Sequence, residues 1–332
     1  MSVASEMEQK LASFREDFNA LRHEVGKRIV GREEAVDLVL TALVAGGHVL
    51  VEGLPGLGKT ELARTLAAVI DAGFQRIQCT SDLMPADAIG TYVIMETPQG
   101  RRTFEFQKGP LFANIVLIDH VNRAMPRTQS ALLEAMDEQS ITVSTETFRL
   151  PEPYFIIATQ NPLDLEGTYP LPPAQVDRFL LKVLLGPPDA QQLERILELT
   201  TDATPVKLRA VVDGPRVLEM GQLVRQVPLA AEIRRRAVAI VAATGPENPQ
   251  APPSVRRYVR YGASPRGAQA LVLAAKIRAI LDGRYHVSAD DLGAAAHAAL
   301  RHRLTLNYEG QADEIRSDAL IDEILSGLKD EG

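Results

Sequence analysis

The hydrophobic positions of the chain follow a helical spacing at first and then gather into short runs. Residues 6–26 carry apolar side chains at helical spacing, which predicts an amphipathic leading helix. These positions are Met7, Leu11, Phe14, Phe18, Leu21 and Val25. Short apolar runs occupy residues 48–53, 74–78, 115–119, 154–159 and 179–184. Helical stretches such as 61–70 and 127–138 separate several of the runs, and this alternation predicts an α/β fold with a parallel sheet between helices.

Two segments with strand-like residues around a polar centre interrupt this alternation. The first is residues 91–106, with Pro98 and Gly100 in its turn, and the second is residues 141–150. Neither has the long apolar character of a buried central strand. We therefore expect both to be β-hairpin insertions.

The composition changes at Gly186-Pro187-Pro188. Only helical patterns follow, and a proline-rich break at residues 245–254 splits them. They cover residues 189–200, 216–226, 230–243, 266–282, 289–302 and 313–328. The pattern predicts a leading helix (1–26), an αβα core that carries both hairpins (27–186) and a small all-helical domain (187–332).

Composition narrows the classes of protein that fit. The net charge of −7 gives no electrostatic footprint for non-specific nucleic-acid binding. Cys79 is the only cysteine, so no disulfide framework exists, and the histidines lack metal-ligand spacing. No apolar run reaches the roughly 18 residues of a membrane span. We expect a cytoplasmic protein with no nucleic-acid partner and no membrane span.

A phosphate-binding loop is predicted between the strand at 48–53 and the helix at 61–70. Residues 53–60 fit the pattern G-x-x-x-x-G-K-[ST] at every fixed position. Glycines let backbone N–H groups turn toward phosphates, Lys59 reaches the β and γ phosphates, and Thr60 ligates Mg²⁺. The residues expected to bind ATP are Gly53, Leu54, Pro55, Gly56, Leu57, Gly58, Lys59, Thr60 and Glu61.

A second magnesium ligand is expected where another apolar strand ends. Asp119 closes the run Ile-Val-Leu-Ile-Asp at residues 115–119, which is the position of a Walker B carboxylate. The alternative is an aspartate that only caps the next turn. Beside a phosphate-binding loop we favour the magnesium role.

Several further motifs, in this order, are similar to those of one family. They lie at residues 121–139 (VNRAMPRTQSALLEAMDEQ), 158–162 (ATQNP), 171–179 (LPPAQVDRF) and 261–271 (YGASPRGAQAL). With the loop at 53–60 they resemble the MoxR family of AAA+ ATPases, from about Ile29 to about Leu328. The resemblance implies a P-loop AAA+ core followed by a helical lid.

The resemblance also implies roles for individual residues. Asn161 looks like sensor 1, Arg178 looks like the arginine finger for the neighbouring subunit, and Arg266 looks like sensor 2, brought to the phosphates by the lid. Val30 and Gly31 look like part of the adenine pocket. The first three residues also have an alternative without a catalytic role. Asn161 could simply open a turn, and Arg178 and Arg266 could be solvated arginines.

Assembly and partners follow from the same resemblance. A finger from the next subunit implies a ring, expected to be a hexamer, and the family often works with a partner that carries a von Willebrand factor A domain. In such rings the two hairpins face the pore and touch the protein client. The alternative is that they are structural hairpins at a subunit contact.

The residue after Asp119 departs from the family pattern. The pattern has a glutamate that polarises the attacking water, and this chain has His120. A neutral imidazole accepts a proton, but nearby phosphates favour the imidazolium form, which has only donors; bound Mg²⁺ acts in the opposite direction. We therefore expect impaired hydrolysis with nucleotide binding largely kept.

Three functions remain open on the sequence alone. The first is an ATP-driven, chaperone-like remodeller of a protein client, and the second is a nucleotide-gated ring scaffold with little or no turnover, which His120 favours. The third is a DNA helicase-like motor, against which the acidic charge argues.

Overall fold

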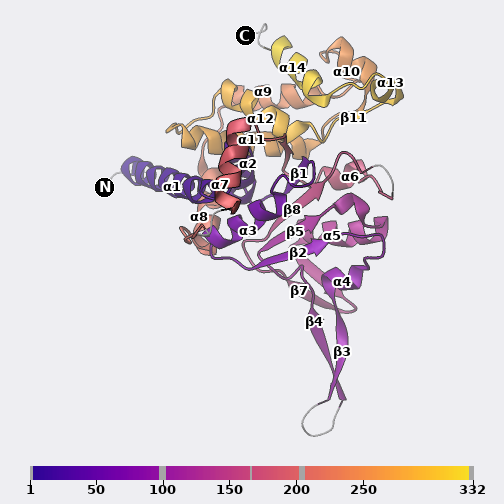
Figure 1. The fold of residues 1–332 in the computed structure, drawn as a ribbon. Coiled ribbons are helices and arrows are strands. Elements are labelled where there is room, and N and C mark those ends of the chain that lie inside the picture. The colour runs from indigo at the N-terminus through magenta and orange to yellow at the C-terminus, as the bar shows by residue number, and fades with distance from the viewer. Residues whose placement is uncertain (1–2, 97–101, 165–166, 202–205, 329–332) are drawn as a thin grey trace.

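The computed structural model describes residues 3–96, 102–164, 167–201 and 206–328. Three regions are visible in Figure 1: a sheet with its helices, a mainly helical lid above it, and a hairpin that projects downward. In the described residues no helix is both long enough and apolar enough to cross a membrane.

The central sheet has five strands in the order β2-β5-β8-β1-β9, and every neighbouring pair is parallel. The strands are β1 (Val49–Gly53), β2 (Phe74–Gln78), β5 (Ile115–Asp119), β8 (Phe155–Gln160) and β9 (Leu181–Leu185). All residues of β5 are buried, as are the first five of β8, which agrees with the apolar runs that predicted them. The α/β prediction is confirmed.

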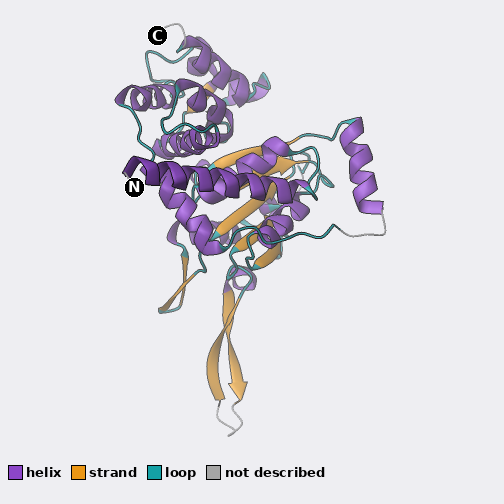
Figure 2. Cartoon of the chain, turned by 90° about the vertical axis from the view of Figure 1, so that its left-hand side faces the viewer, coloured by secondary structure: helices purple, strands orange, loops and turns teal. Residues whose placement is uncertain are grey.

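Helices cover both faces of the sheet because successive strand residues point to opposite sides. In β1, Val49 and Val51 belong to one apolar cluster and Leu50 belongs to the other. The first cluster includes residues of α1 (Val3–Gly26), α2 (Glu33–Val44) and α3 (Lys59–Val69). The second includes residues of α4 (Pro85–Ile89) and α5 (Pro126–Glu138). Figure 2 shows the long α1 lying across the body of the molecule.

The two predicted hairpins exist and touch each other. One is β3 (Gly90–Glu96) with β4 (Arg102–Lys108), and the other is β6 (Ser140–Val143) with β7 (Glu146–Arg149). The rings of Phe106 and Phe148 stack with centroids 4.5 Å apart. The predicted turn at Pro98 and Gly100 lies outside the described residues.

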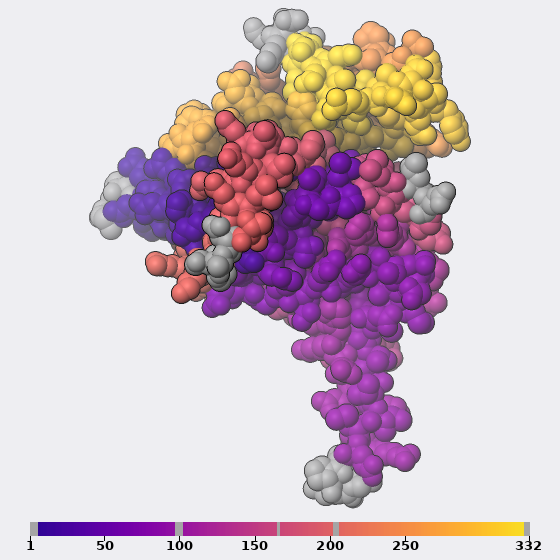
Figure 3. All heavy atoms as spheres, in the orientation of Figure 1, coloured from indigo at the N-terminus to yellow at the C-terminus, as the bar shows by residue number. Residues whose placement is uncertain are grey.

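The long hairpin narrows to two glycines where it leaves the core. Gly90 has a φ of 108°, and an added Cβ there would lie 2.2 Å from the carbonyl oxygen of Gln107. At Gly109 an added Cβ would lie 2.3 Å from the carbonyl oxygen of Ala88. Only glycine fits at such close approaches of two backbones. Beyond the contact of Phe106 with Phe148, the hairpin stands clear of the body (Figure 3).

In its described residues the C-terminal region is helical except for one two-stranded sheet, so the all-helical prediction was wrong in this detail. Its helices are α7 (Ala190–Thr201), α8 (Gly214–Gln226), α9 (Ala231–Ala242), α10 (Pro253–Tyr258), α11 (Pro265–Leu281), α12 (Ala289–Leu300), α13 (Tyr308–Ala312) and α14 (Ser317–Gly327). Strands β10 (Val259–Tyr261) and β11 (Thr305–Leu306) pair antiparallel between them. These strands are too short to leave a periodic pattern in the sequence. The expected helix at 313–328 begins at Ser317 because the chain turns between α13 and α14.

Helices α7 and α8 differ in how closely they pack against the rest of the molecule. None of the residues of α7 is buried, and it stands apart as the separate helix at the right of Figure 2. In contrast, α8 contacts α1, α2 and α11. The division of the chain at residues 26 and 186 stays a prediction.

Candidate functional site

The loop at residues 53–60 has the geometry of an anion cradle. It joins the end of β1 to Lys59, the first residue of α3. Gly56 and Gly58 have φ values of 82° and 79°, a left-handed conformation that side chains rarely adopt. The N-terminus of α3 has no side-chain cap, so its N–H groups and the positive end of its dipole are available to an anion.

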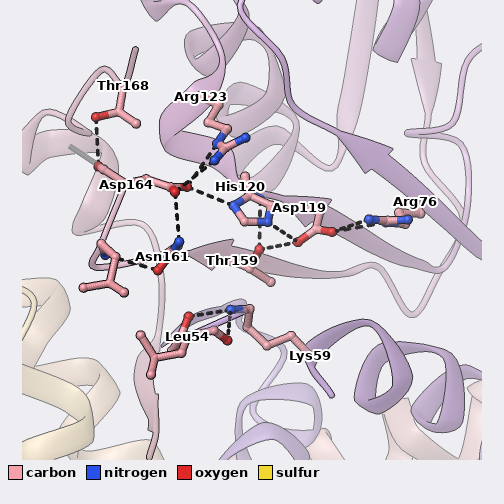
Figure 4. Close-up of polar contacts among 12 residues, drawn as sticks. Leu54, Lys59, Arg76, Asp119, His120, Arg123, Thr159, Asn161, Asp164 and Thr168 are labelled. Carbon is pink, nitrogen blue, oxygen red and sulfur yellow. Dashed lines mark hydrogen bonds and ion pairs between the residues drawn. The ribbon is translucent and has the colours of Figure 1, made fainter. Parts of the chain in front are cut away.

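Lys59 is folded into this loop, where only 7% of the residue is exposed. Its Nζ donates hydrogen bonds to the carbonyl oxygens of Gly53, at 2.5 Å, and Leu54, at 3.0 Å (Figure 4). Burial lowers its pKa from the usual value, while the nearby carboxylates of Asp119 and Asp164 oppose that change. The charge of Lys59 therefore interacts with the carboxylates of both Asp119 and Asp164.

Asp119 ends β5 with its carboxylate engaged on both oxygens. Oδ1 accepts a hydrogen bond from Thr159 Oγ1 at 2.6 Å, and Oδ2 accepts one from Arg76 Nη2 at 2.6 Å. Burial tends to raise the pKa of Asp119, but the hydrogen bonds from Thr159 and Arg76 outweigh it and the pKa is lowered. Arg76 lies on the neighbouring strand β2, and the sequence analysis missed it.

His120 lies directly beyond Asp119 in a left-handed backbone conformation, with φ 57° and ψ 52°. Its backbone N–H donates to Thr159 Oγ1 at 2.9 Å, and its Nδ1 lies 3.2 Å from Asp164 Oδ2. A hydrogen bond to a carboxylate requires the proton on Nδ1, so a neutral ring carries its lone pair on Nε2. That nitrogen is 3.9 Å from Asp119 Oδ1.

Asp164 joins three of the surrounding side chains and was also missed. Arg123 donates to both of its oxygens, at 3.0 and 2.9 Å, and Asn161 Nδ2 donates to Oδ1 at 2.8 Å. The hydrogen bond from Arg123 is the main cause of a lowered pKa at Asp164. The only signal in the sequence is its place three residues after Asn161, in the turn that follows β8. Figure 4 shows this cluster facing Lys59.

The residues expected at the adenine pocket lie next to the start of α7. An added Cβ at Gly31 would lie 2.3 Å from Cγ of Gln192, so the Gln192 side chain packs directly on this glycine. Nearby, Glu61 Oε1 lies 2.5 Å from Arg28 Nε. The sequence did not reveal the contact between Gln192 and Gly31, and the adenine pocket stays a prediction.

Arg178 and Lys59 lie at opposite ends of the parallel strands of the sheet. It precedes β9, which pairs with β1 from Val49↔Leu181 to Gly53↔Leu185. Lys59 follows the far end of β1, and a strand of this length spans roughly 13 Å. Arg178 therefore lies away from the phosphate-binding loop of its own molecule.

Arg266 lies beside Arg178, and its role as sensor 2 stays a prediction. Nε of Arg178 is 3.3 Å from one oxygen of Asp137, and Nη1 of Arg266 is 3.2 Å from the other. Arg178 also donates to the carbonyl oxygen of Leu133 at 2.6 Å. The position of Arg266 follows from its helix, because Ser264 caps α11 and Arg266 is the second residue of that helix. We call Arg178 and Arg266 the arginine pair.

Comparisons with known proteins agree with this arrangement. Residues 48–181 match the ATPase family associated with various cellular activities (AAA), and residues 254–324 match the AAA lid domain. The Chaperone MoxR1 of Mycobacterium tuberculosis is 39% identical over 91% of this chain and 79% of its own length. The chain belongs to the MoxR family of AAA+ ATPases.

Two further relatives cover this MoxR-family chain almost completely. The uncharacterized protein YeaC of Bacillus subtilis is 40% identical over 93% of both chains. The crystal structure of a candidate ATPase from Cytophaga hutchinsonii is 36% identical, with a TM-score of 0.90 over 98% of both chains. The core-and-lid architecture is thus shared along the whole length.

The residues of this MoxR-family site fit a magnesium nucleotide. Added Cβ atoms at Gly56 and Gly58 would meet nothing within 4 Å, so the cradle is open on that side. Thr60 offers a hydroxyl and Asp119 a carboxylate, the oxygen donors that Mg²⁺ prefers. A cleft of about 510 Å³ continues from Asn161 to lid residues that include His302.

Proposed function

We propose that this chain is an ATP-driven, chaperone-like remodeller of protein clients that works as a ring, with ATP hydrolysis weakened by His120. One observation carries the proposal: Lys59 and the arginine pair lie at opposite ends of the parallel strands of one sheet. A molecule built this way supplies the phosphate-binding half of one site and the arginine half of another.

In this proposal each residue of the phosphate half has a distinct role. The loop 53–60 and Lys59 hold the phosphates, Thr60 and Asp119 hold Mg²⁺, and Asn161 positions the attacking water. Magnesium, when bound, neutralises charge that develops on the β and γ phosphates. Val30, Gly31 and Gln192 border the adenine, and Glu61 holds Arg28 beside the loop.

The arginine half acts on the transition state of the neighbouring subunit. Charge spreads over the γ-phosphoryl oxygens during hydrolysis, and guanidinium donors stabilise it. In the single molecule the Asp137 carboxylate bridges both arginines, so it holds them side by side until the neighbour binds. A hexamer is the ring size we propose.

Client binding is assigned to the projecting β3–β4 hairpin. Ile94 and Phe104 are cross-strand partners on one of its faces and are 60% and 75% exposed. Exposed apolar pairs of this kind suit an unfolded protein segment. A relative bears the name chaperone, which supports this use, and a von Willebrand factor A domain protein in the cytoplasm is the proposed partner.

A second candidate function is a nucleotide-gated ring scaffold with little or no turnover. His120 favours it, because an imidazole replaces a carboxylate beside Asp119 and the imidazole Nδ1 is hydrogen-bonded to Asp164. In that case ATP binding would assemble the ring and hydrolysis would contribute little.

The decisive experiment mixes two inactive variants in a His120→Glu background. Lys59→Ala subunits lack the phosphate half and Arg178→Ala subunits lack the arginine half, so mixed interfaces with both intact halves should regain phosphate release. A finger in trans is worth roughly 10³–10⁵ in rate, which makes even partial rescue measurable. Mixtures that never exceed the sum of their parents would exclude the trans role. Calorimetry checks each half: Lys59→Ala should lose ATP binding and Arg178→Ala should keep it.

A further inference from the structure

One lid residue holds the segment that carries the first member of the arginine pair. Arg303 follows α12, and only 2% of its side chain is exposed. Its Nη2 donates to the carbonyl oxygens of Asp177, at 3.0 Å, and Phe179, at 2.7 Å. Its Nη1 donates to the carbonyl oxygen of Leu180 at 3.1 Å. The guanidinium thus binds the backbone on both sides of Arg178, and we call residues 177–180 the clamp segment.

The same guanidinium reaches the second member of the pair through one carboxylate. Nε of Arg303 donates to Oδ1 of Asp177 at 2.8 Å, and the other oxygen of Asp177 accepts from Ser264 Oγ at 2.7 Å. Ser264 caps α11, and its Oγ accepts from the backbone N–H of Arg266 at 3.1 Å. Asp177 therefore fixes the start of the helix that presents Arg266.

Two neighbours keep Arg303 in this position. Nη1 of Arg303 lies 2.8 Å from His302 Nε2, which itself lies 3.0 Å from the carbonyl oxygen of Phe179. In α11, an added Cβ at Gly267 would lie 3.1 Å from Cδ of Arg303, so the helix backbone packs on the arginine stem. The planar fork of five donors matches several fixed acceptors at once, which the single ammonium of a lysine does not.

We propose that Arg303, with Asp177, is a positioning residue that aims Arg178 and Arg266 together at the neighbouring subunit. The inference rests on the proposed function and deepens it by naming what sets the geometry of the arginine half. Because Arg303 belongs to the lid and the clamp segment belongs to the core, a change in lid orientation reaches both arginines at once. A misplacement of about 1 Å costs on the order of 10²-fold in rate.

The subunit-mixing experiment tests this directly, because the substitution is added to one subunit type at a time. Arg303→Met in the Lys59→Ala subunit disturbs the arginine half of the active interface, and rescue should fall about 10- to 100-fold. Arg303→Met in the Arg178→Ala subunit disturbs a half that is already disabled, and rescue should stay within about twofold of the parent mixture. Arg303→Lys in the first position should lose less than Arg303→Met.

Each outcome decides the question. Equal loss in both positions would mean a general effect on the lid, and no loss in either position would mean that Arg303 does not aim the pair; both results overturn the inference. A parent mixture without rescue would instead overturn the trans role, and the inference would fail with it. Arg284→Met is the matched control, since it removes a lid arginine that binds Asp291 and not the clamp segment.

A second readout needs no turnover. The Leu180 backbone N–H donates to the carbonyl oxygen of His48 at 2.8 Å, so the clamp segment is protected from hydrogen exchange. In Arg303→Met and in the milder Asp177→Asn, exchange at residues 177–181 should rise, while residues 59–69 keep their protection. Unchanged exchange at 177–181 in both variants would show that the segment holds its position without the clamp.

Discussion

His120 has a backbone that is held independently of its side chain. The left-handed conformation is secured by the hydrogen bond from its N–H to Thr159, whose hydroxyl in turn donates to Asp119. A substitution at this residue therefore changes the chemistry beside Asp119 more than the path of the chain. This makes the position well suited to a test by mutation.

His120→Glu should raise ATP turnover about tenfold or more, because a carboxylate there polarises the attacking water and general-base catalysis contributes about 10²–10⁴ in rate. ATP affinity should change little, since our proposal assigns binding to Lys59, Thr60 and Asp119. Steady-state phosphate release at saturating ATP measures the change. An unchanged rate from a fast wild type would refute the weakened-hydrolysis proposal.

The hydrogen bond between His120 and Asp164 supports a competing account. An imidazole oriented by a carboxylate through Nδ1 is the arrangement of a working base, with Nε2 toward the reaction. That account requires competent turnover that is lost in His120→Ala. A slow wild type whose turnover His120→Ala leaves unchanged favours our proposal.

If Asp119 holds Mg²⁺ as we propose, Arg76 should compete with the ion, because Arg76 donates to the same carboxylate. A charged hydrogen bond contributes about 1.5 kcal/mol, so Arg76→Gln should lower the Mg²⁺ concentration for half-maximal ATP binding by about tenfold. Titration of magnesium with a fluorescent ATP analogue measures this, and Arg76→Lys is the charge-conserving control. A higher magnesium requirement in Arg76→Gln would mean that Arg76 orients the carboxylate instead.

Site residues that local patterns mark could be predicted from the sequence. Those that depend on tertiary contacts could not. The loop 53–60 and Asp119 stand at the ends of apolar runs, so their neighbourhood could be foreseen from strand and helix order. Arg76, Asp164 and Gln192 come from other strands, turns and helices. Apart from the short step from Asn161 to Asp164, nothing near them in the chain predicts the contacts that they make.

At the scale of elements, His48 forms hydrogen bonds that link the end of α5 to the first residues of strand β8. Its Nε2 donates to the carbonyl oxygen of Met136 at 3.1 Å, and its Nδ1 accepts from the backbone N–H of Ile156 at 3.0 Å. Both bonds are satisfied by the neutral ring. Asp137, which holds the arginine pair, follows Met136 directly.

Burial lowers the pKa of His48 to about 4, so acid should weaken the fold here. Between about pH 6.5 and pH 4 the unfolded chain binds a proton that the folded chain does not. This group's contribution is complete above pH 6.5, and up to about 3 kcal/mol of it is lost as the pH falls to 4. Urea unfolding across this range should show a shallower pH dependence in His48→Gln. An equal slope in the variant would mean that His48 titrates normally.

Elements with a strong period could be predicted, and short or proline-led ones could not. The five parallel strands and both hairpins follow from apolar runs and alternation. The proline-rich break hid α10, because Pro253 opens that helix where its missing N–H costs nothing. The sequence also could not show that α11 starts beside Arg178, since the hydrogen bond from Ser264 to Asp177 joins residues 87 apart.

At the scale of the whole molecule, the separation of its two half-sites predicts that turnover depends on concentration. ATPase activity per subunit of His120→Glu should rise with protein concentration and then level off as rings fill, while ATP binding per subunit stays constant. Phosphate release over a dilution series measures it, with sedimentation on the same samples. Constant specific activity down to a monomeric sample would show that one molecule completes its own site.

The length of the β3–β4 hairpin has a consequence for any tilt at its glycine root. The seven-residue strand β3 spans about 20 Å beyond the point where Gly90 and Gly109 leave the core. A tilt of about 10° at this root would carry the far end of the strands through about 3–4 Å over that length. Angular changes too small to disturb the packed sheet would then become a displacement of several ångströms at the outer end.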